Sequence, residues 1–269
     1  MAGHPIFPPE IECIIFLTAF ELKPVDNDIV DLLLVAKRVH EWLIPKVYQT
    51  LVVQRIPPYR EYPIRLTINN LRKYGHHTRN FFVSLGSTRW IAQDQYFSFC
   101  PNITNLVLRT KTQLDRTHLE RISSLSLTHL SVDMIGPPSS TPGLFPLFSG
   151  ITHLCVFRSL LSGDTTRFTS LTHLAILNTY NEAVCTSILE NHPKLEVLVL
   201  LQWGFVVGVT GSFDLGVDDP RIVRITYRDE VLVEDWLSDV KEGRGMWGLA
   251  DEKVRQRKKL KEAAWRVPE

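Results

Sequence analysis

The sequence predicts an α/β protein whose middle part repeats a short strand followed by a returning segment. A pattern of apolar residues, apolar-x-x-apolar-x-apolar, recurs six times along the 269 residues at intervals of 20 to 27 positions. Three of these units contain Thr-His-Leu in the same frame, as "SLTHLSV" from Ser126, "GITHLCV" from Gly150 and "SLTHLAI" from Ser170. A period of this length is typical of stacked repeats, so we interpret the three histidines first as members of a repeating unit.

The apolar pattern also sets the register of the predicted sheet. Residues alternate between the two faces of a strand, so the last two apolar positions of each unit point into the core together. The six units are Ile103/Leu106/Leu108, Leu127/Leu130/Val132, Ile151/Leu154/Val156, Leu171/Leu174/Ile176, Leu195/Leu198/Leu200 and Ile222/Ile225/Tyr227, with a weaker earlier unit at Thr78/Phe81/Val83. Over residues 75–230 the pattern resembles a leucine-rich repeat, and this resemblance implies an irregular solenoid in which leucines fill a continuous core.

Some of the returning segments are predicted to be helical. Asn181 can cap a helix that ends before Pro193, and residues 115–122 are a weaker helical candidate. The returning chain is expected on the far side of the sheet, away from the outward strand residues.

The first 55 residues do not follow the repeat and predict a small helical module. Apolar residues recur at helical spacing after Pro8 and Pro9, which suit a first helical turn, and Pro24 ends this helix. Asp26 offers a cap for a second helix, and a third helix is expected to be interrupted at Pro45. Three short amphipathic helices cannot bury all of their apolar surface alone, so part of it is expected to meet a partner.

Four short motifs of this module occur in a characteristic order. They are Phe7-Pro8-Pro9-Glu10, Ile15-Phe16, Leu34-Val35-Ala36-Lys37-Arg38 and Val47-Tyr48-Gln49-Thr50-Leu51. From Ile6 to Val53 the chain resembles the F-box, the helical module by which substrate receptors dock onto the adaptor subunit of a cullin-RING ubiquitin ligase, especially in fungal F-box-like proteins. The resemblance implies adaptor contacts at Phe7, Pro8, Pro9, Ile11, Ile15, Phe16, Leu34, Val35 and Trp42. The chain departs from the family in having Phe7 where a leucine is usual and only six residues before it, and the competing interpretation is a helical cap that protects the first repeat.

The histidines of the three central units are predicted to form a column on the outer face of the sheet. His129, His153 and His173 each precede an inward leucine, so alternation directs them away from the core, on neighbouring strands about 5 Å apart. The flanking positions of the column are assigned to Asn80, Asn105, Glu196 and Arg224. A transition-metal site needs converging ligands, which Cys155 or Glu196 would have to complete. We expect no metal, and histidines that face solvent or a partner.

Two further outward columns are predicted to be unusually apolar. They contain Val107, Ser131, Cys155, Ala175 and Val199, and Arg109, Asp133, Phe157, Leu177 and Leu201. Phe157, Leu177 and Leu201 would form a contiguous patch on adjacent strands, with the three histidines, Arg109, Asp133 and Arg158 at its polar rim. We interpret this face as the surface that binds a protein substrate. The competing expectation is that the C-terminal segment from Trp236 to Trp265 covers the patch.

Composition and charge narrow the functional classes. With 44% hydrophobic residues the chain can form a buried core, and its 30 Lys and Arg against 29 Asp and Glu give no overall field that would attract nucleic acid or an anionic membrane. The four cysteines lie far apart and never form Cys-x-x-Cys, so we expect them to be reduced. The apolar run at 14–20 is too short to span a bilayer and follows acidic residues, which predicts a cytoplasmic or nuclear protein.

No catalytic motif stands out. Residues 243–248 match the spacing G-x-G-x-x-G, but the charged stretch 234–242 precedes them where a dinucleotide site requires a buried strand. The chain has no Walker loop, no G-x-S-x-G and no H-E-x-x-H. We therefore expect no enzymatic activity and no cofactor, unless the histidine column binds a metal.

Residues 231–269 are predicted to form a helical cap with a basic tail. Trp236 and Trp247 are expected to pack on the last repeat. The basic run of Arg255, Arg257, Lys258, Lys259 and Lys261 predicts either a nuclear-import patch or a solvated helix face. The whole pattern favours a substrate-recognition subunit of a cullin-RING (SCF-type) ubiquitin ligase, with the adaptor subunit and a protein substrate as its partners. The alternative is a leucine-rich-repeat binding module unconnected to ubiquitin.

Overall fold

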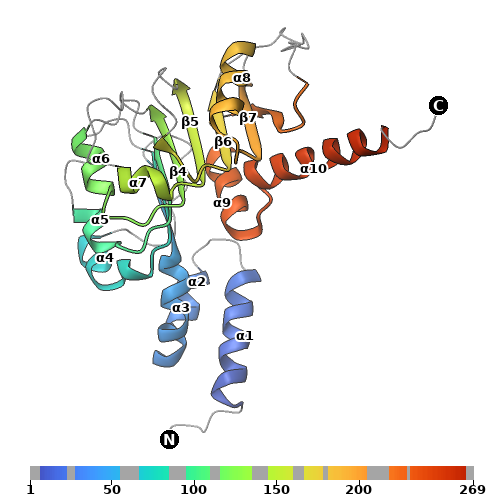
Figure 1. The fold of residues 1–269 in the computed structure, drawn as a ribbon. Coiled ribbons are helices and arrows are strands. Elements are labelled where there is room, and N and C mark those ends of the chain that lie inside the picture. The colour runs from blue at the N-terminus through green and yellow to red at the C-terminus, as the bar shows by residue number, and fades with distance from the viewer. Residues whose placement is uncertain are drawn as a thin grey trace, which may run out of the picture.

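The protein is a mixed α/β structure built on one open, eight-stranded parallel sheet (Figure 1), which confirms the predicted class. The computed structural model describes residues 7–22, 28–54, 67–84, 95–109, 116–134, 145–159, 167–177, 181–204, 218–228 and 231–264. The strands lie in the order in which they occur in the chain. They are β1 (Thr50–Gln54), β2 (Asn80–Ser84), β3 (Asn105–Arg109), β4 (His129–Met134), β5 (His153–Ser159), β6 (His173–Leu177), β7 (Val197–Trp203) and β8 (Ile222–Tyr227).

The register from β2 to β7 follows the predicted repeat frame. His129 pairs with His153, and His153 pairs with His173, so the three Thr-His-Leu units stand side by side. The inward leucines after these histidines have almost no exposure, as predicted from strand alternation. The weak unit around Phe81 is strand β2, and its Asn80 pairs with Asn105.

The sheet begins and ends differently from the prediction. Strand β1 starts at Thr50, within the range expected for the helical module, and pairs with β2. In β8, Ile222 and not Ile225 lies opposite Leu198, because the turn before β8 brings the Arg221 carbonyl to the Leu198 amide at 2.9 Å. The position beside His173 is also taken by Val197 rather than Glu196, because Val197 directly precedes the inward Leu198.

One face of the sheet is covered by the helices that return between strands. They are α4 (Ile68–Tyr74), α5 (Gln95–Phe99), α6 (Arg116–Ile122), α7 (Phe145–Gly150) and α8 (Glu182–Asn191), with a short 3-10 helix at Gly75–His77. Asn181 caps α8 by accepting a hydrogen bond from the Ala183 amide at 2.9 Å, as predicted. The inward strand residues and these helices form the first core, which runs from Ile44 to Ile222.

The opposite face is covered by the C-terminal helices α9 (Leu232–Glu242) and α10 (Met246–Ala264). A second core forms there from the outward strand residues together with Val233, Trp236, Ala250 and Val254. In Figure 1, α10 crosses the end of the sheet near β7 and β8 and then projects away from the body. A fully parallel sheet normally has both faces covered, and this sheet follows that rule.

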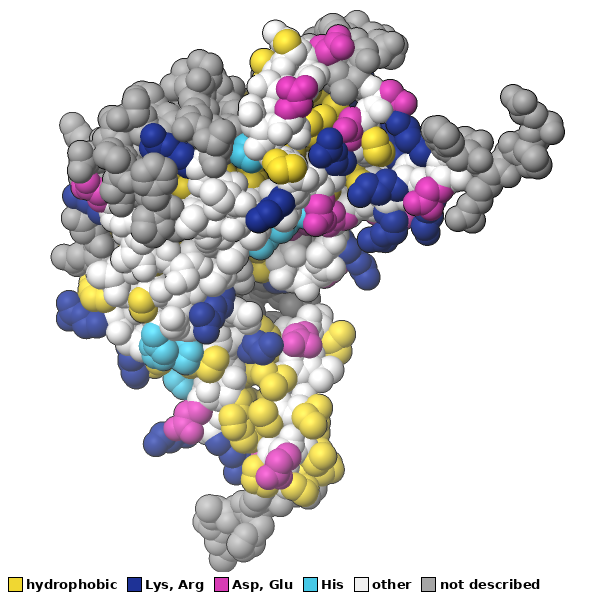
Figure 2. Space-filling view, viewed as in Figure 1, with side chains coloured by type: hydrophobic (Ala, Val, Ile, Leu, Met, Phe, Trp, Pro, Cys, Tyr) yellow, Lys and Arg dark blue, Asp and Glu magenta, His cyan; other side chains and the backbone are white. Residues whose placement is uncertain are grey.

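The N-terminal helices lie beside the first strand. They are α1 (Pro9–Leu22), α2 (Asp28–Leu34) and α3 (Lys37–Gln49). Pro45 lies inside α3 and does not interrupt it, contrary to the prediction, because the neighbouring Leu43, Ile44 and Val47 are buried and hold the helix against the first core. By contrast, α1 has no buried residue, and hydrophobic side chains gather over it in Figure 2.

Candidate functional site

The three histidines form a stacked column on strands β4, β5 and β6. The ring centroids of His129 and His153 are 4.0 Å apart with planes 16° apart, and those of His153 and His173 are 4.1 Å apart with planes 10° apart. Parallel strands at identical register place successive side chains directly beside one another, which is why the rings stack face to face.

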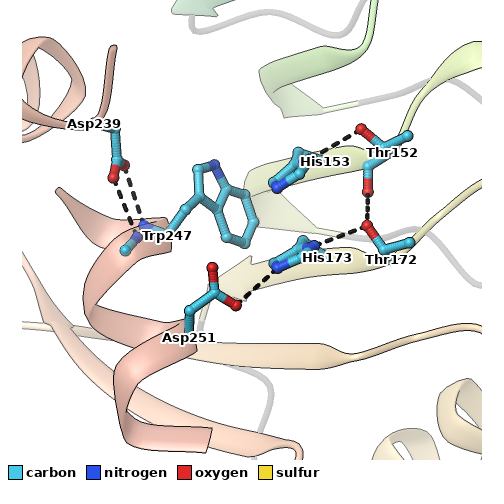
Figure 3. Close-up of polar contacts among 8 residues, drawn as sticks. Thr152, His153, Thr172, His173, Asp239, Trp247 and Asp251 are labelled. Carbon is cyan, nitrogen blue, oxygen red and sulfur yellow. Dashed lines mark hydrogen bonds and ion pairs between the residues drawn. The ribbon is translucent and has the colours of Figure 1, made fainter. Parts of the chain in front are cut away.

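A ladder of threonine hydroxyl groups holds the rings (Figure 3). Thr152 Oγ1 donates to the carbonyl oxygen of Thr128 at 3.1 Å and lies 2.9 Å from Nδ1 of His153, and Thr172 repeats both contacts one strand further on. A hydroxyl has one proton to donate. Since that proton goes to the carbonyl, Nδ1 of His129 and of His153 is the donor to the hydroxyl, and Nε2 of these neutral rings is left as an acceptor.

The last histidine of the column is bound to the C-terminal helix. His173 Nε2 lies 3.0 Å from Oδ1 of Asp251 on α10. A lone pair and a carboxylate cannot form a hydrogen bond without a proton between them, so Nε2 of His173 is the donor in this contact. The contact joins the end of the column to α10.

The other two rings are held neutral. Burial, followed by repulsion from the charge on His173, lowers the pKa of His129 to about 4. Burial, followed by repulsion from both neighbours, lowers the pKa of His153 to about 2. Adjacent rings about 4 Å apart cannot all be charged without strong mutual repulsion.

The stacked arrangement is unsuited to a metal ion. The rings are nearly parallel, so their Nε2 atoms point the same way instead of converging on one point. In the described part of the chain there is no group of three or more His, Cys, Asp or Glu residues that could hold a metal. Cys155 is fully buried in the second core, where burial raises the pKa of its thiol, and Glu196 is exposed outside the column.

The turn between α9 and α10 covers the histidines. We expected them to face solvent or a partner, and the structure instead places them against this turn of the same chain. The Trp247 ring meets His153 edge-on at 5.3 Å, and it meets His173 at 5.8 Å. The Asp239 carboxylate fixes this turn by accepting hydrogen bonds from the backbone amides of Trp247 and Gly248, at 3.1 and 3.3 Å.

The G-x-G-x-x-G spacing is explained by the same turn. Gly243 ends α9 with φ of 62°, a conformation that favours glycine. A Cβ on Gly245 would lie 2.1 Å from the Asp235 carbonyl oxygen, and one on Gly248 would lie 1.7 Å from the Gly243 carbonyl oxygen. Gly243 is thus favoured by the backbone conformation of this turn, and Gly245 and Gly248 by its close packing. The element before them is the helix α9 and not a strand.

The expected apolar patch is buried. Phe157, Leu177 and Leu201 are 3%, 6% and 1% exposed, and they belong to the second core beneath α9 and α10. The prediction that they form an open substrate-binding surface is therefore wrong for this structure, because apolar side chains on adjacent strands are buried more favourably by an amphipathic helix of the same chain. The competing expectation, coverage by the C-terminal segment, describes the structure.

The expected polar rim of that patch is likewise internal. Arg109 forms an ion pair with Asp133 at 2.8 Å, and its guanidinium lies 4.3 Å from the centre of the Phe157 ring. Arg109 also donates to the hydroxyl group of Tyr227 on β8. The sequence prediction placed Tyr227 in the first core and missed this contact, because the frame assigned to β8 was displaced by three residues.

A cavity of about 220 Å³ remains between the sheet and the α9–α10 turn. It begins beside His129, at the end of the histidine column opposite Asp251-bound His173, and extends under the turn. Its lining residues are Asn105, His129, Ser131, Trp236, Asp239, Gly243, Trp247, Gly248 and Asp251.

The residues predicted to contact an adaptor lie mainly on the surface. Ile11, Ile15, Leu34 and Val35 are 44%, 46%, 77% and 58% exposed, and Phe7 is 50% exposed. Pro8 and Pro9 are exposed as well, whereas Phe16 and Trp42 are half-buried.

Two ion pairs join α1 to α3. Arg38 lies 2.7 Å from Glu12, and Lys46 lies 3.9 Å from Glu21. Phe20 on α1 packs partly against the first core. The helix is thus held on the body by few contacts, and the isoleucine side chains of its outer face stay uncovered.

Searches of known protein families, curated proteins and solved structures found no match to this chain. No helix in the described ranges has the length and apolar character needed to cross a membrane.

Proposed function

We propose that this protein is a receptor subunit of a cullin-RING ubiquitin ligase, which docks the adaptor subunit through α1, α2 and the start of α3. The observation that carries the proposal is the uncovered apolar face of these helices. Ile11, Ile14 and Ile15 on α1, Leu34 at the end of α2 and Val35 directly after it are each more than 40% exposed. Exposed large apolar side chains that are contiguous mark interaction sites in soluble proteins.

The arrangement of these side chains favours a helix-mediated interface. Ile11, Ile14, Ile15 and Leu22 are spaced as one face of a helix, and each of them is more than 40% exposed. The same positions belong to the stretch whose motifs resemble the F-box. A plain helical cap would instead turn its apolar face toward the sheet, as α3 does with Leu43, Ile44 and Val47.

The protein-substrate partner is assigned to a different surface from the one predicted by sequence. The apolar part of the sheet face is covered by α9 and α10, so a substrate would contact these helices or the sheet edges. Phe157, Leu177 and Leu201 would then act indirectly, by packing beneath the two helices. The alternative function, a binding module unconnected to ubiquitin, retains the same exposed helices with another partner.

Co-purification with the adaptor subunit tests the proposal. Ile15→Glu places a charge in the uncovered face, where it would be desolvated by a docked partner, and should abolish co-purification. Leu260→Glu is the matched control, because Leu260 is 70% exposed on the projecting part of α10. Circular dichroism should show both variants folded. Adaptor binding by the Ile15 variant equal to that of the control would support the module unconnected to ubiquitin.

A further inference from the structure

The cavity under the α9–α10 turn has an acidic and aromatic lining with no basic side chain. Asp239 and Asp251 contribute carboxylates, Trp236 and Trp247 contribute indole rings, and His129 contributes an imidazole that burial keeps neutral. Lysine and arginine are absent from the lining residues. The lining therefore favours a positively charged occupant over a neutral or negative one.

The hydrogen-bonding capacity of the lining points the same way. Nδ1 of His129 is held by Thr128 Oγ1 at 2.9 Å, so Nε2 is the ring atom left to accept from an occupant. Asp251 contacts His173 through Oδ1, and among the described residues no hydrogen bond is made by its Oδ2. The indole nitrogen of Trp236 already donates to Asn105 Oδ1 at 3.1 Å. Nε2 of His129 and the Asp251 carboxylate thus offer acceptors to the cavity, which suits a group with several N–H donors.

Burial strengthens this preference. Desolvation raises the pKa of Asp239, because its carboxylate is buried with only backbone amides as hydrogen-bond donors. A cation beside it would recover part of the lost solvation energy. The indole rings can contact such a cation through their faces while excluding water.

The volume limits the size of the occupant. About 220 Å³ is below the range of roughly 300–1,000 Å³ that is usual for sites of drug-sized ligands and cofactors. An unbranched side chain ending in a charged group fits this limit better than a nucleotide or a ring cofactor.

We propose that this cavity binds a primary alkylammonium group, supplied either by a lysine side chain of a partner protein or by a free small amine. The ammonium would lie between Asp251 and Nε2 of His129, with its alkyl chain against Trp236 and Trp247. This site goes beyond the proposed function and does not depend on it, because it involves none of the adaptor-docking residues on α1 and α2.

Titration of the full chain, followed by the indole ¹H–¹⁵N NMR signals of Trp236 and Trp247, tests the proposal. The probes are n-butylammonium chloride, N-acetyl-lysine methylamide and the uncharged N-acetyl-norleucine methylamide. The two ammonium compounds should shift both signals saturably, with a dissociation constant on the order of 1 mM, and the norleucine compound should not. Tighter binding of the lysine compound would identify a protein side chain as the source, and tighter binding of butylammonium would identify a free amine.

Two variants separate the cavity from general charge effects. Asp251→Asn should weaken ammonium binding at least about fivefold, since a hydrogen bond to a charged group is replaced by one to a neutral amide. Glu252→Gln is the matched control, because Glu252 is adjacent in α10 but binds Arg255 outside the cavity. His129→Leu removes the imidazole acceptor without touching the contact between Asp251 and His173, and should also weaken binding. Equal binding of the norleucine compound, absence of saturation with either ammonium compound, or unchanged affinity in both cavity variants would overturn the proposal.

Discussion

Acidification should destabilise the protein through the neutral histidines of the column. Histidine has a pKa near 6.5 in an unfolded chain, whereas the folded-state pKa is about 4 for His129 and about 2 for His153. Below pH 6.5 the unfolded chain therefore binds protons that the folded protein does not. By linkage, the free energy of unfolding is fully retained above pH 6.5 and falls as the pH drops below that value.

The magnitude follows from the pKa differences. Between its folded and unfolded pKa values, each histidine lowers the free energy of unfolding by about 1.4 kcal/mol per pH unit of acidification. A fall from pH 6.5 to 5 therefore lowers it by at most about 2 kcal/mol for each ring. Both rings are only half-buried, and solvent screening reduces this value, so we expect about 1 to 3 kcal/mol for the pair. Such a loss is a substantial part of a typical stability of about 5–15 kcal/mol.

Urea denaturation at pH 7 and pH 5 measures the effect. The double variant His129→Gln/His153→Gln cannot take up these protons and should lose less stability than the wild type between the two pH values. Comparison with the variant is needed because the raised pKa of Asp239 acts in the opposite direction, stabilising the folded state on acidification. His40→Gln controls for the loss of an imidazole outside the column. An identical pH dependence in the wild type and the double variant would refute the reasoning.

Three further predictions concern the column and its cover. In ¹⁵N NMR spectra at neutral pH, His129 and His153 should be protonated at Nδ1 and unprotonated at Nε2, and the opposite tautomer would contradict the threonine ladder. Gly245→Ala should destabilise the protein by more than the roughly 1 kcal/mol expected for Gly243→Ala. Only the substitution at Gly245 brings a Cβ against a backbone carbonyl oxygen, and equal denaturation midpoints of the two variants would exclude that clash. Deletion of residues 232–264 should expose the second core and cause aggregation and dye binding, whereas a monomeric truncated protein would show that this face tolerates solvent.

The central strands could be predicted because their sequence signal is local and repeated. Each inward leucine is fixed by alternation within its own strand, and identical Thr-His-Leu units at nearly constant spacing repeat the same register. At β8 the signal was ambiguous, since Ile222 and Ile225 both fit the apolar pattern. The ion pair between Asp219 and Arg221 at 2.7 Å belongs to the turn that sets the start of this strand, and no periodicity in the sequence reports it.

The position of α9 and α10 on the outer face of the sheet could not be predicted from the strand patterns, because the contacts of these helices join distant parts of the chain. The Trp236 indole nitrogen bonds to Asn105 across 131 positions, and Asp251 meets His173 across 78. A signal was nevertheless present in α9, where Val233, Trp236 and Val240 follow helical spacing and form one apolar face. Such a face needs a partner surface, and the apolar outward columns of the sheet are its complement.

The repeated Thr-His-Leu sequence answers three structural demands with three adjacent residues. The leucine fills the first core, and the histidine lies on the opposite face of the sheet. The threonine hydroxyl donates to the carbonyl oxygen of the threonine in the previous unit and so joins the two neighbouring strands. Stacking is a consequence of this repetition, and it places His129 and His153 where burial and their neighbours lower the pKa of both rings. At one end His173 contacts Asp251 and so attaches the C-terminal helix α10 to the sheet, while the neutral His129 at the other end opens into the cavity. The repeated Thr-His-Leu motif thus sets the strand register, contributes the contact that attaches α10, and contributes His129 to the lining of the cavity.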